Sequence, residues 1–357
     1  MKKLLVILSV MALSVVILTA CSSKKEETTK VTETEVVTKE ETDKEIETVT
    51  EVETETETNS EVTVVIPRVT ALKGPTAMGM VKMMSDYEES YDFTVSAAID
   101  EVTTNLVKGD IDIAAVPANL ASVLYNNTDG EIQVMAINTL GVLYIVENQE
   151  SVNTVADLRG KVIYATGKGA TPEAAINYIL KQNGLEAGVD VTIEFKAEPA
   201  ECISALAEDI EGIAMLPQPF VTTAQMQNEN LRIALDLTEE WERVQAAERG
   251  SSLLTGVVVV RKEFAETNKE VVNVFLDQYA SSVEFVNAEL EEAAALIEAY
   301  DIVKAQVAKI AIPYCNIAFI EGVEMEEKLL GYLEVLFAQN PKSVGGAIPS
   351  EDFYYRR

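Results

Sequence analysis

The stretch FTVSAAIDEVTTNLVKGDIDIAAVPANLASVLY, residues 93–125, decides the fold. Short apolar runs alternate here with segments whose apolar residues recur every three or four positions, and Gly109 stops the first such segment. We expect strand, helix, strand and helix at residues 93–99, 102–108, 111–116 and 118–125. Strands that alternate with helices predict an α/β fold, with a mostly parallel sheet covered by helices on both faces.

The same alternation continues on both sides of this stretch. Toward the N-terminus we expect a buried strand at residues 62–67 and a helix through Met78, Val81 and Tyr87. Further strands are expected at residues 132–137, 142–146, 162–165, 191–195, 213–216, 233–235 and 254–260. Helices are expected at residues 172–182, 200–207 and 220–227, and residues 262–336 should be almost entirely helical, with a long stretch at 270–300.

The length of the folded part predicts two lobes. Residues 62–357 exceed the size at which one hydrophobic core stops growing and chains divide. We assign residues 62–140 to the first part of lobe 1, 141–254 to lobe 2, and 255–357 to the return to lobe 1 and the C-terminal helices. The chain should cross between the lobes in the strands at 142–146 and 254–260.

The N-terminus has the order of a secretory signal peptide. Lys2 and Lys3 precede an apolar run at residues 4–18, which is shorter than the ~20 residues of a membrane-spanning helix. The small residues before Cys21 resemble the bacterial lipobox, in which the cysteine is lipid-modified, for example with palmitate, and becomes the new N-terminus. We therefore predict a lipoprotein signal peptide at residues 1–20 and lipidation at Cys21. An ordinary cleavage site with a chance cysteine is the alternative.

An acidic segment follows the cysteine. Residues 22–61 carry fourteen acidic residues against five lysines and almost no bulky apolar residue. Such a segment cannot bury enough surface to offset its chain entropy, and its charges repel one another. We predict that residues 21–61 form the lipidated cysteine and a disordered tether. A strand at residues 45–57, where Glu alternates with Thr and Val, is the alternative.

Charge and composition exclude several classes of protein. The net charge of −31 argues against nucleic acid as a partner, because phosphates require a basic surface. The chain has no histidine, which excludes Ser-His-Asp and Cys-His catalysis and removes the commonest transition-metal ligand. We predict no catalytic residue, no metal and no cofactor. Cys202 and Cys315 can form one disulfide, but two buried free thiols are the favoured state.

Three motifs carry a resemblance to a known family. They are Leu72-Lys73-Gly74-Pro75-Thr76, Gly109-Asp110-Ile111-Asp112-Ile113-Ala114 and Val155-Ala156-Asp157-Leu158-Arg159-Gly160-Lys161-Val162. Their order resembles that of type 2 periplasmic binding proteins, and within them the nitrate, sulfonate, taurine and thiamine-precursor receptors. The resemblance covers roughly residues 62–340. It implies an α/β, two-lobed fold with two crossing strands, a ligand in the cleft between the lobes, and closure around that ligand.

This fold suggests where the ligand binds. In open α/β sheets, ligands lie beyond the carboxyl ends of the strands, where loops lead into helix N-termini. The loops that follow predicted strands supply the candidate ligand-binding residues Lys73, Gly74, Thr76, Asn119, Lys168, Gly169, Thr171 and Gln218. Thr139, at the crossing, and Asn316, beside the helix-breaking Pro313-Tyr314, are added on weaker grounds.

Each candidate also has a structural alternative. Thr76 and Asn119 can be simple helix caps, Lys168 a solvent-exposed loop charge, and Gln218 part of a rigid turn between two prolines. Thr139 can belong to a hinge, and Asn316 to a turn between helices. Arg68, expected just after the first strand, is the best-placed guanidinium for a carboxylate or sulfonate, although such arginines more often bond to nearby backbone. Trp241 is expected to cover a lobe surface.

These observations favour a receptor over an enzyme. We predict an extracytoplasmic solute-binding lipoprotein that captures a small molecule and delivers it to the permease of an ABC importer, held to the bacterial cell membrane by its lipid. An enzyme on the same fold, related to those of menaquinone or pyrimidine biosynthesis, is an alternative, as is a lipoprotein that senses a ligand without transport. The ligand should belong to the nitrate, sulfonate, thiamine-precursor or heterocycle class. Few cations lie near the expected cleft, which favours a neutral or heterocyclic solute.

Overall fold

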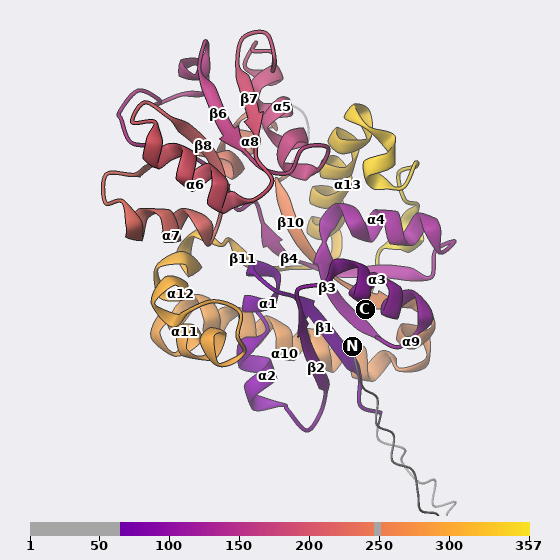
Figure 1. Ribbon diagram of the computed structural model, residues 1–357. Coiled ribbons are helices and arrows are strands. Elements are labelled where there is room, and N and C mark those ends of the chain that lie inside the picture. Colours follow the sequence, from indigo (N-terminus) through magenta and orange to yellow (C-terminus); the bar gives the residue numbers. More distant parts are fainter. Residues whose placement is uncertain (1–64, 246–250) are drawn as a thin grey trace, which may run out of the picture. The chain divides into compact units, whose positions relative to one another are not determined.

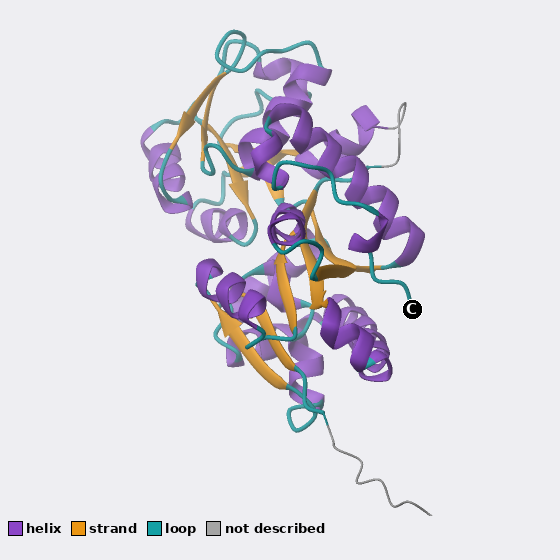
Figure 2. Cartoon of the chain, turned by 90° about the vertical axis from the view of Figure 1, so that its right-hand side faces the viewer, coloured by secondary structure: helices purple, strands orange, loops and turns teal. Residues whose placement is uncertain are grey.

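The computed structural model describes residues 65–245 and 251–357 (Figure 1). The predicted signal peptide, Cys21, the acidic tether and the first residues of the predicted strand at 62–67 lie outside these ranges. Residues Val62–Arg357 group as one compact unit. Within it the strands form two separate sheets, which Figure 2 shows from a second side.

Lobe 1 is built on a six-stranded sheet with the order β11-β4-β10-β3-β1-β2. Its strands are β1 (Arg68–Leu72), β2 (Asp92–Ser96), β3 (Ile113–Pro117), β4 (Ile132–Leu140), β10 (Leu254–Arg261) and β11 (Ile317–Ile320). β1 pairs parallel with β2 and β3, whereas β10 pairs antiparallel with β3 and β4. β10 returns from the other lobe and so enters the sheet from the opposite end. The sheet is therefore mixed, not mostly parallel.

Lobe 2 is built on a five-stranded sheet with the order β7-β6-β8-β5-β9. Its strands are β5 (Leu143–Glu147), β6 (Val162–Ala165), β7 (Thr192–Phe195), β8 (Ile213–Pro217) and β9 (Arg232–Asp236). β6 pairs parallel with β7 and β8, and the crossing strand β5 pairs antiparallel with β8 and β9. Each lobe thus contains one antiparallel strand that arrives from its partner lobe, and lobe 1 contains a second antiparallel strand, β11, which pairs with β4.

Helices cover both faces of each sheet. In lobe 1 and the C-terminal part they are α1 (Pro75–Met78), α2 (Val81–Asp86), α3 (Ile99–Lys108), α4 (Ala118–Asn127), α9 (Lys262–Thr267), α10 (Lys269–Ala288), α11 (Leu290–Ala299), α12 (Ala305–Ala311) and α13 (Gly322–Gln339). In lobe 2 they are α5 (Thr171–Gln182), α6 (Pro199–Glu208), α7 (Phe220–Gln227) and α8 (Leu237–Gln245). Short 3₁₀ turns lie at Val155–Leu158, Ile312–Tyr314, Pro341–Val344 and Glu351–Phe353.

Local sequence explains where these elements begin and end. In α3, Asp100 and Glu101 lie in the first turn and Lys108 in the last, which suits the helix dipole. Gly109 ends the helix in the left-handed conformation, at φ 84°, which glycine adopts without strain. Along β10, alternate valines enter different cores, with Val257 on one face and Val258 on the other. A strand buried on both faces reads as a continuous apolar run.

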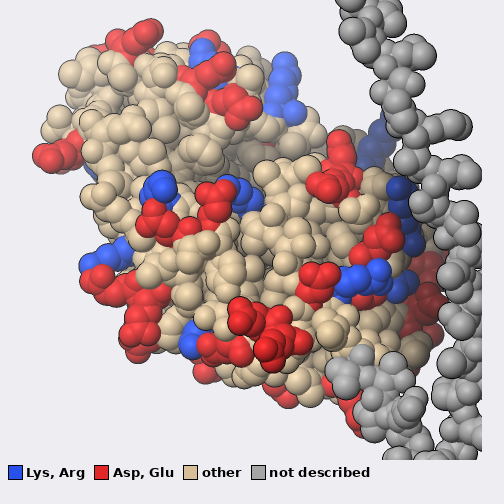
Figure 3. Space-filling view, turned by 60° about the horizontal axis from the view of Figure 1, so that its bottom comes forward, with Lys and Arg blue, Asp and Glu red and all other residues tan. Residues whose placement is uncertain are grey.

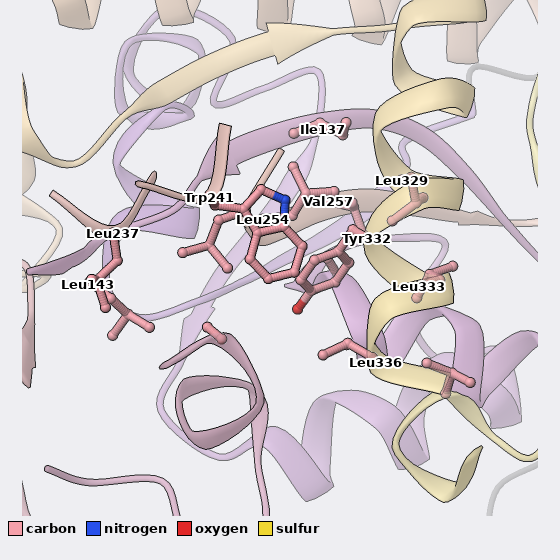
Figure 4. Packing of buried hydrophobic residues seen from close by; sticks show 14 of the residues in the cluster. Ile137, Leu143, Leu237, Trp241, Leu254, Val257, Leu329, Tyr332, Leu333 and Leu336 are labelled. Atoms are coloured by element: carbon pink, nitrogen blue, oxygen red, sulfur yellow. The ribbon is translucent and has the colours of Figure 1, made fainter. Parts of the chain in front are cut away.

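One hydrophobic core is shared by the two lobes. It includes Ile137 of β4, Ile145 of β5 and Leu329 of α13, all fully buried. The single tryptophan, Trp241 of α8, lies in the same core and is fully buried, in contrast to the surface position expected for it (Figure 4). Its ring packs 4.6 Å from that of Tyr178 in α5 and 6.1 Å from that of Tyr332 in α13, measured between centroids. The C-terminal helix α13 therefore packs against lobe 2 as well as lobe 1.

Several predicted elements are wrong. The strand expected at residues 62–67 is absent from its described part, residues 65–67, and β1 begins at Arg68. Pro67 has no N–H to donate to a sheet, and the apolar pair Val65 and Ile66 is exposed. The region expected to be almost entirely helical contains the strand β11, and the long stretch at 270–300 is two helices divided at Glu289.

Because β1 begins later than expected, the position of Arg68 in the sheet also differs from the expected one. This residue begins the strand instead of following it, so it lies at the opposite end of the sheet from the expected ligand. Its guanidinium binds Asp112, with Nη2 2.6 Å from Oδ1, and donates to the carbonyl of Gly109 at 2.7 Å. Arg68 is therefore a structural residue of lobe 1, in agreement with the favoured alternative that such an arginine bonds to nearby backbone.

The two described cysteines are free and buried, as predicted. Cys202 lies in α6 of lobe 2 and Cys315 lies just before β11 of lobe 1. Burial raises the pKa of Cys202 to about 11 and that of Cys315 to about 12. Both thiols therefore stay protonated at neutral pH and are poor nucleophiles.

Candidate functional site

The chain passes from one sheet to the other in only two residues. β4 ends at Leu140 and β5 begins at Leu143. Leu143 lies opposite Pro217 of β8, and Tyr144 lies opposite Asp236 of β9. The start of β5 is therefore beside the carboxyl ends of β8 and β9. Because β6 is parallel to β7 and β8, the carboxyl ends of β6 and β7 share that edge.

Lobe 1 presents the matching edge. The carboxyl ends of β1, β2 and β3 lie together because these strands are parallel, and β4 ends on the same side because β10 is antiparallel to both β3 and β4. β11 begins there, with Ile317 opposite Thr139. We call these two edges, which adjoin at the crossing, the strand-end edges. Such edges are where ligands bind in open α/β sheets.

All ten predicted ligand-binding residues lie on the strand-end edges. On lobe 1 they are Lys73, Gly74 and Thr76 after β1, Asn119 after β3, Thr139 at the end of β4 and Asn316 before β11. On lobe 2 they are Lys168, Gly169 and Thr171 after β6 and Gln218 after β8. Some of their side chains are exposed and can contact a solute, whereas others are hydrogen-bonded within the protein.

Two of the lobe 1 hydroxyls are engaged within the protein. The Thr76 hydroxyl donates to the carbonyl of Leu72 at 2.7 Å, and Thr139 donates to the Asn138 carboxamide oxygen at 3.1 Å. Asn138 completes the network by donating to the Thr76 carbonyl at 3.1 Å. All three side chains are buried. This network fixes the first turn of α1 against the end of β4.

The loop after β1 is more open. Lys73 is exposed, and its ammonium lies 3.0 Å from the carboxylate of Asp301. Gly74 has φ 123°, a conformation that L-residues rarely adopt, and a Cβ there would meet nothing within 4 Å. The backbone at the start of α1 is thus accessible to a molecule that approaches the edge.

The loop after β6 is built on two glycines. Gly167 and Gly169 have φ values of 80° and 76°. The amide of Gly169 donates to the carboxylate of Glu173 at 2.5 Å, so the loop is closed by a side chain of its own helix. Lys168 is exposed and has no hydrogen-bonding or ionic partner within residues 65–245 and 251–357.

One pair of predicted residues joins the two edges directly. The Thr171 hydroxyl lies 3.5 Å from the Asn119 carboxamide oxygen and 3.3 Å from the Tyr332 hydroxyl of α13. Asn119 also donates to the carbonyl of Ser343 at 3.1 Å. A surface pocket of about 280 Å³, lined by Gly169, Thr171 and α13 residues among others, lies beside this contact.

Gln218 and Asn316 lie at the crossing itself. Gln218 is 2% exposed, and its carboxamide oxygen accepts from the Thr222 hydroxyl at 2.9 Å, whereas its amide Nε2 is buried without a partner. Asn316 has φ 46°, and its Nδ2 donates to the carbonyl of Gly141 at 2.6 Å. Gly141 has no space for a side chain, since a Cβ would lie 2.9 Å from Leu253 and closer still to the hydroxyl of Thr238.

Two residues of the edges, Asp236 and Tyr144, were not predicted from the sequence, whereas Tyr314 was named there beside Asn316. Asp236 ends β9, and its Oδ1 accepts from the amide of Thr238 at 2.8 Å. Burial raises the pKa of Asp236, although nearby backbone amides counteract this. The Tyr144 hydroxyl donates to the carbonyl of Tyr314 at 2.7 Å, and the residue Tyr314 is 44% exposed. The available signal was Asp236-Leu237-Thr238-Glu239, an N-cap pattern after a predicted strand, but no helix was expected there.

Cations are scarce near the strand-end edges. All seven arginines in the described part of the chain form ion pairs with carboxylates; they are Arg68, Arg159, Arg232, Arg243, Arg261, Arg356 and Arg357. Figure 3 shows acidic side chains in several separate groups over one face of the protein. The described residues contain no group of three or more Cys, Asp or Glu residues arranged to hold a metal ion. Nor do they contain a helix both long and apolar enough to cross a membrane.

Comparisons with known proteins agree with this geometry. The family model described as "ABC transporter, phosphonate, periplasmic substrate-binding protein" matches residues 82–310, more than half of the chain. No curated protein sequence matches the chain significantly.

Similar solved structures share the fold at low sequence identity. An ABC transporter protein from Parabacteroides distasonis aligns with a TM-score of 0.68 at 23% identity, over 82% of this chain and 99% of that one. The periplasmic aliphatic sulphonate binding protein of Escherichia coli aligns with a TM-score of 0.63 at 18% identity, over 82% and 92% of the two chains. The periplasmic nitrate-binding protein of Synechocystis gives 0.52 at 16% identity, over 82% and 84%.

Proposed function

The chain belongs to the family of phosphonate-type periplasmic substrate-binding proteins of ABC transporters, and on that premise we propose that it captures its solute between the two strand-end edges. Members of this family bind a small molecule outside the cytoplasm for an ABC importer. One observation carries the proposed location: the two-residue crossing at Gly141 brings the carboxyl ends of strands from both sheets together. The same place is where open α/β sheets bind ligands.

The proposed binding residues are the ten on the edges, with the crossing as the hinge. Lys73, Gly74, Lys168 and Gly169 lie in accessible loops, and Gln218 offers a buried amide without a partner. Thr76, Thr139 and Asn316 support the edge through bonds within the protein. A solute that contacts both edges binds the closed form more tightly than the open form, and so shifts the population toward closure. The permease then distinguishes loaded from empty receptors by shape.

We further propose that lipid at Cys21 anchors the chain to the extracytoplasmic face of the cell membrane. The support is the sequence of residues 1–21 and the acidic segment that follows. Acyl chains contribute about 0.8 kcal/mol for each methylene they bury, and a tether lets the receptor reach its permease. Radiolabelled palmitate should enter the wild-type protein and not Cys21→Ala, which should leave the membrane fraction. Equal labelling of both proteins would contradict the anchor.

We propose a receptor without catalytic activity, because of the family to which the chain belongs and because of the residue types that it contains. The chain has no histidine, and burial raises the pKa of both described thiols, so histidine-based and thiolate catalysis are not supported by these residues. For the solute we propose a neutral or heterocyclic compound, because the edges offer few cations.

A ligand screen tests the proposal. The purified protein is heated with sulfonates, nitrate, phosphonates, thiamine precursors, nucleobases and amino acids, and its unfolding temperature is measured. We expect a saturable rise for one class of compound, recovered chemically unchanged. Conversion of the compound would favour the enzyme alternative, and unchanged affinity after substitution of Gln218 and Asn119 would place binding elsewhere.

A further inference from the structure

Amides in or just before the first turns of the helices on the lobe 2 edge are bonded to side chains of this protein. The amide of Gly169, before α5, binds the Glu173 carboxylate at 2.5 Å, and the amide of Ala197, before α6, binds the Glu201 carboxylate at 3.0 Å. The amide of Thr238 in α8 binds the Asp236 carboxylate at 2.8 Å. At α7, the Gln218 carboxamide oxygen accepts from the Thr222 amide at 3.3 Å.

This arrangement works against an anionic solute. Helix N-termini bind phosphate, sulfonate and carboxylate groups through their free amides and positive dipole. On this edge, three of the four helices have a carboxylate bound to an amide in or just before their first turn, which places a negative charge beside the helix N-terminus. An oxyanion would have to displace these side chains and would then lie beside their charges.

In the described parts of both edges, every cation that could compensate is already paired except Lys168. Lys73 is bound to Asp301, and Lys196, after β7, lies 2.7 Å from the carboxylate of Glu194. Only Lys168 remains without a partner there, on an exposed loop. No arginine is available for a bidentate contact, since each described arginine pairs with a carboxylate of the protein.

Unsatisfied groups at the crossing indicate what the solute supplies instead. Gln218 is 2% exposed, and its amide nitrogen is buried without a hydrogen-bond partner. Buried polar groups are rarely left unpaired, so each needs an explanation. Asp236 forms no ion pair with any described residue. The edge therefore offers a carboxylate that lacks a cation and an amide donor that lacks an acceptor.

The spacing of these groups suits a small ring compound. Gln218 follows β8 and Asp236 ends β9, on the two sides of β5. Neighbouring strands are about 4.8 Å apart, which separates the two residues by roughly 10 Å. Two aromatic side chains on the edges are partly open to solvent, Tyr314 at 44% and Phe220 at 40%. Exposed rings can stack on a flat molecule or on a cation.

We infer that the solute is a neutral or cationic compound whose amine or ring N–H donates to Asp236 and whose acceptor atom receives the Gln218 amide, and that oxyanions are rejected. The inference rests on the proposed function, because it assigns the solute class of the same edges. It departs from the phosphonate named in the description of the matching family. The family indicates that the chain acts as a receptor, and the capped helices indicate which class of solute it binds.

Calorimetry on the full-length protein in detergent tests the inference with matched probes. Benzylamine is compared with benzylphosphonate, 4-aminopyrimidine with pyrimidine-4-sulfonate, and ethylamine with ethanesulfonate. We expect saturable binding of at least one amine and at least tenfold weaker binding of its anionic partner. Tighter binding of any anion than of its amine partner would overturn the inference and leave the receptor proposal intact. Failure of every probe would count against both.

Two kinds of variant test which residues cause the preference for amines over anions. Asp236→Asn keeps the acceptor that caps α8 and removes the charge, so amine affinity should fall about tenfold or more. Glu239→Gln, which changes an exposed acid in the first turn of the same helix, serves as the matched control and should leave affinity unchanged. Glu173→Gln combined with Glu201→Gln should raise the affinity for the anionic partners. Equal amine affinity in Asp236→Asn and wild type would overturn the role of Asp236.

Discussion

At the scale of single residues, the buried carboxylate of Asp112 in lobe 1 explains why Arg68 does not have the ligand-binding role considered for it. Asp112 is 3% exposed and binds both Arg68 and Arg261, at 2.6 and 3.1 Å. The motif Gly109-Asp110-Ile111-Asp112 pointed to the family, but its physical role is this cluster at the end of the sheet far from the crossing. Arg68 is held there and cannot reach a solute.

Replacing Asp112 should destabilise the protein and alter its response to acid. Burial would raise the pKa of Asp112, but the hydrogen bonds from Arg68 and Arg261 outweigh it and hold the pKa below its usual range. Its contribution is therefore present above about pH 4 and is lost as the pH falls through the lowered pKa. Asp112→Asn should cost about 3 kcal/mol at pH 7, because two guanidiniums lose their partner.

Urea unfolding followed by circular dichroism, at pH 7 and at pH 3, checks this prediction. The difference in unfolding free energy between wild type and Asp112→Asn should shrink at the lower pH. A difference that stays constant or grows on acidification would contradict the assigned ionisation.

A second prediction concerns Asn119, which contacts Thr171 of lobe 2 and the carbonyl of Ser343. Asn119→Ala should weaken solute binding by about 1–3 kcal/mol, because it removes polar contacts between the edges. Asn126→Ala is the matched control, since Asn126 also lies on α4 and binds the carbonyls of Val344 and Ala347, away from the edges. Calorimetry with the identified solute should show weaker binding for the first variant only.

The identity of the edges could be predicted from the sequence, whereas the state of individual side chains could not. Strand–helix alternation placed Lys73, Asn119, Lys168 and Gln218 after strands, and the structure places them on the strand-end edges. It gave no sign that Thr76 donates back to Leu72, since that bond depends on the turn geometry of α1. Asp236 was missed because the helix after it has a polar sequence dominated by acids.

At the scale of secondary-structure elements, most predicted elements are confirmed and the errors have physical causes. The bounds of β6 and α7 agree with the expected residues 162–165 and 220–227. β11 was missed because its four residues are a short apolar run among helices, and periodicity cannot separate such a run from helix. The first strand was predicted too early in the chain, because the apolar residues Val65 and Ile66 fit the pattern of a buried strand better than the mixed sequence of β1 does.

The crossing between β4 and β5 should tolerate no added side chain. A Cβ at Gly141 would lie 2.9 Å from Leu253 and closer to the Thr238 hydroxyl, so Gly141→Ala forces both neighbours to shift. Such overpacking costs about 1–3 kcal/mol. Chemical unfolding followed by circular dichroism should show that loss, with weaker solute binding in the same variant. Wild-type stability in Gly141→Ala would mean that the crossing is looser than the structure indicates.

At the scale of the whole molecule, the C-terminal residues tie several elements together. Phe353 is fully buried, and the amide of Tyr355 donates to the carbonyl of Val134 in β4 at 2.8 Å. Arg356 binds Glu326 of α13, and Arg357 binds Asp277 of α10 and Glu321. The chain end thus holds the sheet of lobe 1 to helices on both of its faces.

Truncation after Ser350 should therefore destabilise the protein by at least about 3 kcal/mol, the usual cost of losing one buried phenylalanine. The midpoint of thermal unfolding, measured by calorimetry, should fall accordingly. Arg357→Ala, which removes only exposed ion pairs, serves as the control and should cost less than about 1 kcal/mol. An unchanged midpoint in the truncated chain would show that the tail does not contribute to the core.

The position of the single tryptophan gives the protein a built-in optical reporter. Trp241 belongs to lobe 2, yet it contacts Tyr332 of α13, a helix that also packs on lobe 1 (Figure 4). A change in the angle between the lobes that moves α13 relative to α8 alters the surroundings of this one indole, and therefore its fluorescence. Closure can be timed in a stopped-flow instrument without attaching a dye, and solutes can be ranked by how quickly each one brings the emission to its final value.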